Sequence, residues 1–131
     1  METVKNEAAE AARVEDEVKG AGLDFSSYTH KFRSPVTICG VEARELTFDY
    51  GALTGRDHID AERSCLNGGR NCIPDPKYDG DFLARIAVKA CTLRDVDGFK
   101  ALSLSALESF PIGDYEAIRT SVRNFFIVSS L

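Results

Sequence analysis

The sequence predicts a small α+β domain, in which a two-stranded antiparallel β-hairpin is followed by three to four α-helices. Apolar and polar residues alternate over two short runs that flank Gly40, and this alternation is typical of a half-buried hairpin. Downstream of Thr54 the apolar residues recur at helical spacing instead. A length of 131 residues fits one domain. We place this domain at residues 25–131 and treat residues 1–24 as a separate tail.

The tail differs from the rest of the chain in charge. It carries seven acids and three bases, whereas the remaining residues carry 14 acids and 13 bases. Weakly apolar residues recur in it at helical spacing: Val4, Ala8, Ala11, Val14 or Glu15, and Val18. Such side chains bury little area, and an isolated helix of this length is marginal in water. We expect a disordered tail or a frayed helix that breaks at Gly20 and Gly22; the alternative is a helix that docks on a partner or a second copy.

The hairpin is predicted from two strands, at residues 28–39 and 43–50. Pro35 has no N–H to donate, so we expect it at a sheet edge or facing outward. Gly40 supports a tight turn between the strands. A two-stranded hairpin is marginal alone, so the following helices must cover its apolar face, which consists of Leu46, Phe48 and Tyr50.

The first two helices have clear start signals. Thr54 and Asp57 resemble a capping box for a helix that runs to about Leu66 and ends at the Asn67-Gly68-Gly69 turn. After a proline-containing loop, Asp79 or Asp81 opens the second helix. That helix reaches about Cys91 and has the best apolar stripe in the chain, formed by Phe82, Leu83, Ile86, Ala87, Ala90 and Cys91.

Two further helices complete the predicted fold. A turn at residues 95–98 precedes a short helix at 102–110, for which Ser105 and Glu108 form a candidate capping box and Pro111 is the stop. Asp114 is expected to cap the last helix, which runs to about Val128.

Charge and hydropathy exclude several classes of partner. The domain without its tail is nearly neutral, which argues against nucleic acid and anionic membrane surfaces, because both need a clustered basic face. Apolar runs fall far short of the roughly 20 residues that a membrane span needs. The first residues are acidic and lack the apolar segment of a secretory signal. We therefore expect a cytoplasmic location, with no nucleic acid and no membrane as partner.

Neither a metal site nor a catalytic centre is indicated. The four cysteines lack the C-x₂₋₄-C spacing of structural zinc sites, and His30 and His58 are isolated in the sequence. We expect reduced cysteines and no cofactor; a Cys65–Cys72 bridge or a metal site is the alternative. Asp57 and His58 are neighbours, but adjacent residues on a helix do not face each other. No acid–base–nucleophile set is apparent, so we expect no enzyme.

Exposed apolar surface is therefore the functional candidate. Phe125, Phe126 and Ile127 occupy three neighbouring directions around the last helix, so at least one is expected to point away from the core. We interpret this segment as a partner-binding patch for a helix or another subunit. The alternative is that core and hairpin absorb all three side chains.

An ordered series of motifs resembles a known family. It comprises FRSPVTICG before the glycine turn, LTFDY, TGRDHIDAE, FLARIAVKA, LSLSALESF, and DYEAIRTSVRNFF with its terminal aromatic pair. In order and spacing, residues 28–128 resemble the tail assembly chaperones of tailed bacteriophages and prophages, of the "E, 41 or 14" type.

The resemblance implies a non-catalytic protein of the host cytoplasm that is absent from the mature virion. Such chaperones coat the tape-measure protein, keep its apolar helical segments soluble and help to recruit tail-tube subunits, with many copies along one chain. We expect Phe125–Ile127 or the free edge of the hairpin to do the covering. The competing classes are a structural tail component, such as a tube or tail-completion protein, and a small enzyme or regulator.

Overall fold

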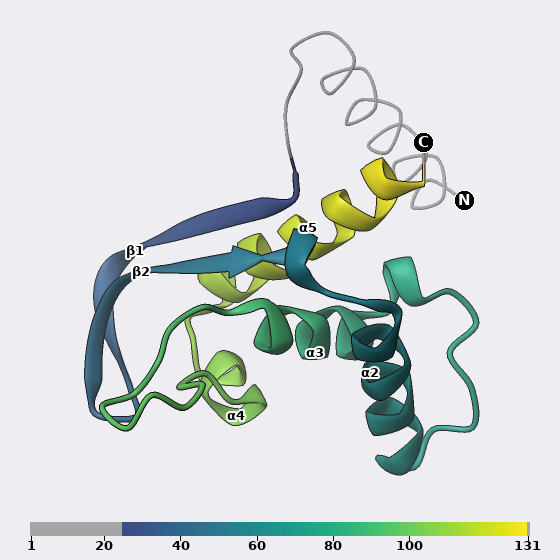
Figure 1. Cartoon of the computed structure of the whole chain (residues 1–131), viewed down its shortest axis with the longest axis horizontal. Coiled ribbons are helices and arrows are strands. Elements are labelled where there is room, and N and C mark those ends of the chain that lie inside the picture. Colours follow the sequence, from purple (N-terminus) through teal and green to yellow (C-terminus); the bar gives the residue numbers. More distant parts are fainter. Residues whose placement is uncertain (1–24, 131) are drawn as a thin grey trace, which may run out of the picture.

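The predicted α+β class is confirmed. The computed structural model describes residues 25–130 and shows a β-hairpin followed by four α-helices (Figure 1). Residues 1–24 and Leu131 lie outside the described part, and so does the prediction of an acidic tail. Within residues 25–130 the sheet consists of two antiparallel strands, β1 (Ser27–Ile38) and β2 (Val41–Asp49).

A two-residue turn joins the strands. Ile38 pairs with Val41 across it, and both turn residues have positive φ, 49° for Cys39 and 75° for Gly40. Positive φ at both central positions is the signature of the type I′ hairpin turn. The sequence predicted the glycine in this turn. The cysteine is unexpected, because a residue with a Cβ rarely adopts positive φ. The Cys39 thiol donates a hydrogen bond to the carbonyl of Ala101 at 3.2 Å.

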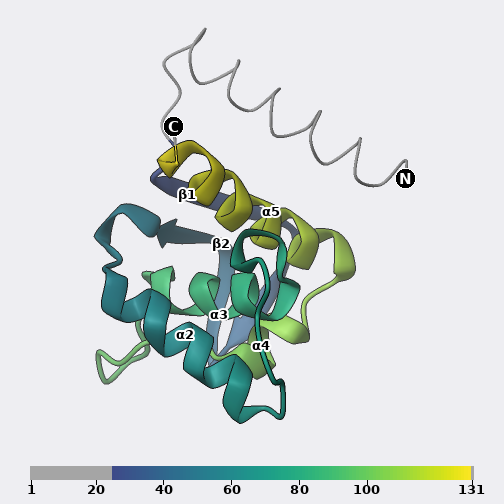
Figure 2. The ribbon, with the colours of Figure 1, turned by 90° about the vertical axis from the view of Figure 1, so that its right-hand side faces the viewer.

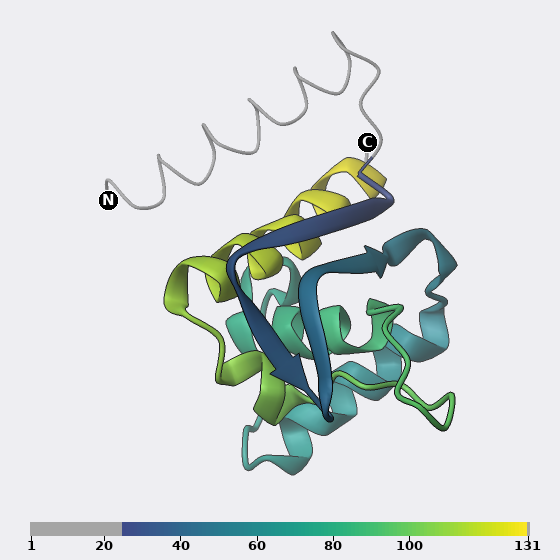
Figure 3. The ribbon, with the colours of Figure 1, turned by 90° about the vertical axis from the view of Figure 1, so that its left-hand side faces the viewer.

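A large bulge interrupts β1 at the position of Pro35. Lys31 pairs with Glu45 and Val36 with Ala43, so residues 32–35 lie opposite the single residue Arg44. The proline is thus excluded from the hydrogen-bond ladder and is exposed, in agreement with the prediction that it faces outward. Both strands change direction along their length, which turns the hairpin into a bent arm over the helices (Figure 3).

The helices pack around a central one. α3 (Gly80–Ala90) contacts α2 (Gly55–Asn67) on one side and α5 (Ile112–Ser129) on another, and α4 (Leu104–Glu108) packs near its end (Figure 2). Two short 3₁₀ turns, η1 (Tyr50–Ala52) and η2 (Pro76–Tyr78), precede α2 and α3. The predicted boundaries of the first two helices agree with the structure to within about a residue.

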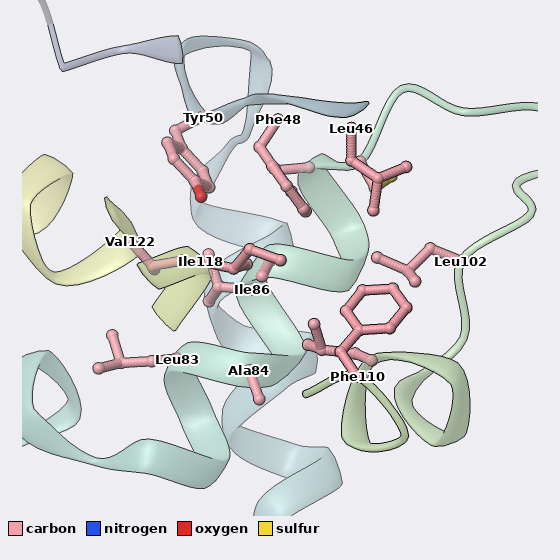
Figure 4. Packing of buried hydrophobic residues seen from close by; sticks show 14 of the residues in the cluster. Leu46, Phe48, Tyr50, Leu83, Ala84, Ile86, Leu102, Phe110, Ile118 and Val122 are labelled. Carbon is pink, nitrogen blue, oxygen red and sulfur yellow. The ribbon is translucent and has the colours of Figure 1, made fainter. Parts of the chain in front are cut away.

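The core lies between the hairpin and α3. Leu46 and Phe48 of β2 and Tyr50 of the η1 turn point toward α3 and α5, as their alternation predicts (Figure 4). The predicted apolar stripe of α3 is buried throughout, and α5 contributes Ile118 and Val122. The Tyr50 hydroxyl remains satisfied in this apolar setting, because it hydrogen bonds to Ser121 Oγ, which in turn donates to the carbonyl of Ile118.

The capping predictions have mixed outcomes. Asp57 accepts a hydrogen bond from the Thr54 amide at 2.9 Å, as the predicted box requires. Asp79, the first of the two predicted residues, caps α3 by accepting from the Phe82 amide at 3.0 Å. The predicted box at Ser105 is wrong. Ser103 caps α4 instead, and accepts from the Ala106 amide at 3.1 Å, so the helix begins one residue before Ser105.

The prediction that Asp114 caps the last helix is also wrong. Pro111 is the residue before α5, which begins at Ile112. Asp114 lies in the first turn, where a carboxylate still suits the helix dipole, but its side chain reaches across to His30 on β1 at 2.7 Å. A tertiary contact therefore takes the place of the local cap.

The free edge of β2 is partly covered. Cys91 forms a bridge with Phe48, and the amide of Thr92 donates to the carbonyl of Thr47 at 2.9 Å. The chain then forms a tight loop that a second bridge, between Arg94 and Lys100, closes around the predicted 95–98 turn. This pairing occupies part of the edge that the sequence suggested as an alternative docking surface.

Candidate functional site: an apolar groove between α2 and α5

The structure divides the predicted patch on α5. Phe125 and Phe126 are half-buried and lie side by side, with ring centroids 5.5 Å apart. Ile127 is only 7% exposed, so it contributes to the interior and offers no docking surface. Of the three predicted partner-binding residues, two thus remain accessible.

These two phenylalanines form one wall of a groove of about 470 Å³. The opposite wall comes from the start of α2 and the turn before it, and includes Leu53, His58 and Ile59. Ile86 of α3, which is buried, lines the groove as well. Ile59 is 44% exposed. The groove therefore offers a largely apolar lining that is open to solvent.

Tilted and edge-on ring contacts connect the groove to the core. Phe125 contacts Tyr50 at 5.5 Å between centroids, and Phe126 contacts Phe82 at 5.8 Å. The His58 ring lies 4.7 Å from Phe82 and 5.9 Å from Phe126. Because each ring is held by a buried neighbour, the groove is preorganised, and a ligand does not have to order its wall on binding.

His58 is the groove residue that the sequence did not indicate. It is isolated along the chain but not in space, because Nδ1 lies 2.6 Å from Glu62 Oε1, one helical turn away. Asp57, its neighbour, turns instead to the Thr54 amide, as expected for adjacent helical residues. The sequence contained one signal for this placement. His58 lies four residues after Thr54 and therefore on the same side of α2, and it is next to the apolar Ile59.

His30 is not isolated either. It is 6% exposed, with Nε2 2.7 Å from Asp114 Oδ1 and Nδ1 2.8 Å from the Tyr28 hydroxyl. With Asp114 ionised, Nε2 donates to the carboxylate and Nδ1 accepts from the tyrosine. Burial and the nearby Asp114 charge raise the pKa of Tyr28. Because both ring nitrogens are already engaged, this cluster acts as a polar clamp between β1 and α5.

A second ion pair fixes the start of α3. Arg70 donates to Asp79 Oδ1 at 2.7 Å and approaches Oδ2 at 2.5 Å, so both carboxylate oxygens are used. The hydrogen bond from Arg70 holds the pKa of Asp79 below its usual value, despite partial burial that acts in the opposite direction. This pair ties the loop after α2 to α3, on which the groove rests.

The cysteines are free thiols of two kinds. Cys39 and Cys72 are exposed, whereas Cys65 and Cys91 are buried, so the alternative Cys65–Cys72 bridge is not formed. Burial raises the pKa of Cys65 to about 11, with a further contribution from a hydrogen bond to Asp81. Burial also raises the pKa of Cys91. Both buried residues act as small apolar side chains.

Within residues 25–130, no helix combines the length and apolar character that crossing a membrane requires. The same part of the chain contains no group of three or more metal-ligating side chains arranged to hold an ion. No family model, curated protein or solved structure matches this chain. The function therefore has to be argued from the groove and from the sequence motifs.

Proposed function

We propose that the protein is a tail assembly chaperone whose α2–α5 groove holds apolar side chains from helical segments of a tape-measure protein. The observation that carries the proposal is the half-exposed pair Phe125 and Phe126 in a preorganised apolar groove. The ordered motifs that resemble the chaperone family support the choice of partner. The protein is non-catalytic in this proposal, and it acts in the host cytoplasm and leaves before the particle is complete.

The size and lining of the groove suit such a ligand. An amphipathic helix binds by inserting anchors spaced at i, i+3 or i+4, and i+7 into an apolar groove. A volume of about 470 Å³ lies within the usual range for small binding pockets, and accommodates one or two large side chains. One site of this kind gives modest affinity, which is compatible with release during assembly.

The polar groups beside the groove favour a wet, reversible contact. Arg56 pairs with Asp60 at 3.6 Å, with both side chains well exposed, and His58 pairs with Glu62. Exposed pairs of this kind add little affinity. Many copies along one tape measure would supply the remaining strength through avidity, and self-association and recruitment of tube subunits belong to the same proposal.

Co-expression with the tape-measure protein tests the proposal. Phe126→Ser removes a groove wall, and Phe99→Ser is a matched control, because Phe99, directly after the 95–98 turn, is 70% exposed. The wild type and Phe99→Ser should keep the tape measure soluble and co-purify with it, and Phe126→Ser should not. Loss of rescue in both variants, or in neither, would contradict the proposed groove.

Mass spectrometry of purified particles separates the chaperone from a structural tail component. A chaperone should be absent from finished particles and present in assembly lysates. Detection of this chain in particles at a stoichiometry comparable with the tube subunit would overturn the proposal.

A further inference from the structure

The polar character of the α2–α5 groove is concentrated in one ring. Thr54 and His58 are the lining residues with polar side chains, and the rest of the lining is apolar or glycine. The Thr54 hydroxyl is already engaged in the cap of α2, because it donates to Asp57 Oδ2 at 3.3 Å. The imidazole of His58 is therefore the polar group that the groove offers to a ligand.

The two ring nitrogens of His58 have different surroundings. Nδ1 lies 2.6 Å from Glu62 Oε1, in an ion pair whose side chains are 37% and 38% exposed. The carboxylate attracts the N–H, so a neutral ring carries its proton on Nδ1 and presents Nε2 as an acceptor. Among residues 25–130, no hydrogen-bond or ion-pair partner contacts Nε2, and this nitrogen is not sealed from solvent. The groove thus contains one accessible acceptor that the fold leaves unused.

Neighbouring aromatic rings hold this acceptor in place. The His58 ring lies 4.7 Å from Phe82 at an interplanar angle of 57°, and it meets Phe126 edge-on at 5.9 Å and 87°. Phe82 is fully buried, so the imidazole rests on a packed support. A ligand does not have to order the ring before it binds.

Such a site suits an aromatic side chain that carries a hydrogen-bond donor. Tryptophan donates through its indole N–H and tyrosine through its O–H, and both combine the donor with a large apolar ring. Leucine or phenylalanine would fill the same space but would cut Nε2 off from water without supplying a donor, which costs free energy. A site that provides a buried polar partner rejects ligands that lack the matching group.

We propose that the α2–α5 groove selects partner helices whose anchor is a tryptophan or a tyrosine, with His58 Nε2 accepting the hydrogen bond from the N–H or O–H of that anchor. Glu62 is a positioning residue in this arrangement, because it keeps the proton of the ring on Nδ1. The inference rests on the proposed function, since it names the side chain that the groove takes from its helical partner.

A second apolar groove, which we call the β1–α5 groove, provides an internal comparison. It measures about 390 Å³, lies between the start of β1 and α5, and includes Tyr28 and Thr120 in its lining. It shares no lining residue with the α2–α5 groove and contains no histidine. A ligand that binds through His58 should leave the amides of Tyr28 and Thr120 unshifted.

Two forms of one synthetic amphipathic helical peptide test the proposal. The first form has a single tryptophan on its apolar face. The second has benzothienylalanine at that position, in which sulfur replaces the indole N–H with little change of shape. Titration of the full-length, nitrogen-15-labelled protein at about pH 8, where free histidine is neutral, gives the Kd of each form. The wild type should bind the tryptophan form about threefold to tenfold more tightly, the range that one net hydrogen bond contributes.

Two variants assign this preference to the ring nitrogen. His58→Phe keeps an aromatic ring at this position but removes the acceptor, so both peptides should bind equally. Glu62→Ala should weaken the preference without abolishing binding, because the proton of the ring can then move to Nε2. Both variants are checked for folding by circular dichroism, and Glu62→Ala carries the test if His58→Phe does not fold.

Asp60→Ala is the matched control. It removes a carboxylate from the same helix, but one that pairs with the exposed Arg56 and does not line the groove. It should keep the full preference for the tryptophan form.

The outcomes separate this inference from the proposed function. Equal binding of both peptides by the wild type, with shifts in the α2–α5 groove, would overturn the inference and leave the proposed function standing. An undiminished preference in His58→Phe, or in Glu62→Ala, would also overturn the inference. Shifts confined to the β1–α5 groove, or no shifts with either peptide, would contradict both.

Discussion

Two pairs of aromatic residues in this molecule are chemically similar but differ in how deeply they are buried. Phe48 of β2 and Tyr50, which begins the η1 turn just after it, are 0% and 1% exposed, whereas Phe125 and Phe126 of α5 are only half-buried. Tyr50 directly follows β2 and keeps the alternation of the strand, in which residues two apart point to the same face, so the core on that face buries both (Figure 4). Adjacent residues on a helix point about 100° apart, and the core on one side of α5 cannot absorb both rings.

The comparison separates what stabilises the fold from what is available for recognition. The Phe48–Tyr50 pair holds the hairpin to α3 and α5, and the Phe125–Phe126 pair is left as a supported but accessible wall. The same helix contributes Ile118 and Val122 to the core and Phe126 to the groove. Substitutions in the two regions should therefore have opposite consequences for stability and for binding.

The largest expected effect is on the Phe48–Tyr50 pair. Phe48→Ala should lower the free energy of unfolding by about 3–5 kcal/mol, because it leaves a cavity in a packed core. Phe126→Ala should cost no more than about half as much, since its ring is already partly in water. Urea denaturation followed by circular dichroism measures both. Equal losses for the two variants would remove the distinction between core and groove.

The polar clamp between β1 and α5 should have the next largest effect. Asp114→Ala leaves Nε2 of the buried His30 without its partner, and should cost about 1–3 kcal/mol of stability. Asp60→Ala is the control, because its pair with Arg56 is exposed and should be worth less than about 1 kcal/mol. If Asp114→Ala is as mild as the control in denaturation, α5 is held by apolar packing alone.

Acid should weaken the support of the groove through Asp79. Its pKa is lower in the folded protein than the ordinary value of 3.8, so the folded state binds the proton less well than the unfolded state. The stabilisation is complete above that value and is lost as pH falls through the folded pKa. Asp79→Asn should therefore flatten the decline in melting temperature below about pH 4, apart from a constant loss of the charged pair.

Glu108→Gln is the control for this decline of the melting temperature in acid, since Glu108 is exposed at the end of α4. Its melting temperature should follow that of the wild type over the whole pH range. If the melting temperature of the Asp79→Asn variant falls in acid as steeply as that of the wild type, other carboxylates control the decline.

The smallest perturbation is chemical labelling of the thiols. Cys39 and Cys72 should react with a thiol reagent in the native protein, and Cys65 and Cys91 only after unfolding, because burial raises their pKa and blocks access. Mass spectrometry of the labelled protein should show two fast additions. Rapid labelling of Cys65 would mean that α2, which forms a wall of the groove, detaches readily from α3.

The elements of the fold that depend on hydrophobic periodicity could be predicted from the sequence. The alternation in β2 and the apolar stripe of α3 identified the core, and Gly40 identified the hairpin turn. The sequence could not predict the His30–Asp114 contact, because the two residues lie 84 positions apart and only the packing of α5 on β1 joins them. For the same reason Asp114 resembled a cap, although its partner is on another element.

The candidate site was only partly predictable. Phe125 and Phe126 stood out as an aromatic pair, and the expectation that at least one would point away from the core agrees with their exposure. The burial of Ile127 and the contribution of Leu53, His58 and Ile59 depend on how α2 lies against α3, which no local pattern encodes. α2 buries only Ala61 and Cys65, and its His58 and exposed Ile59 complete the groove.

The most direct test is an NMR titration of the nitrogen-15-labelled protein with synthetic helical segments of the tape-measure protein. The account predicts saturable shifts at Leu53, His58, Phe125 and Phe126 with an apolar segment, and none with a segment whose apolar face has been replaced by polar residues. The Phe126→Ser variant should show at least a tenfold weaker response. Shifts confined to the 95–98 loop or to the β1–α5 groove, or no shifts with any segment, would contradict it.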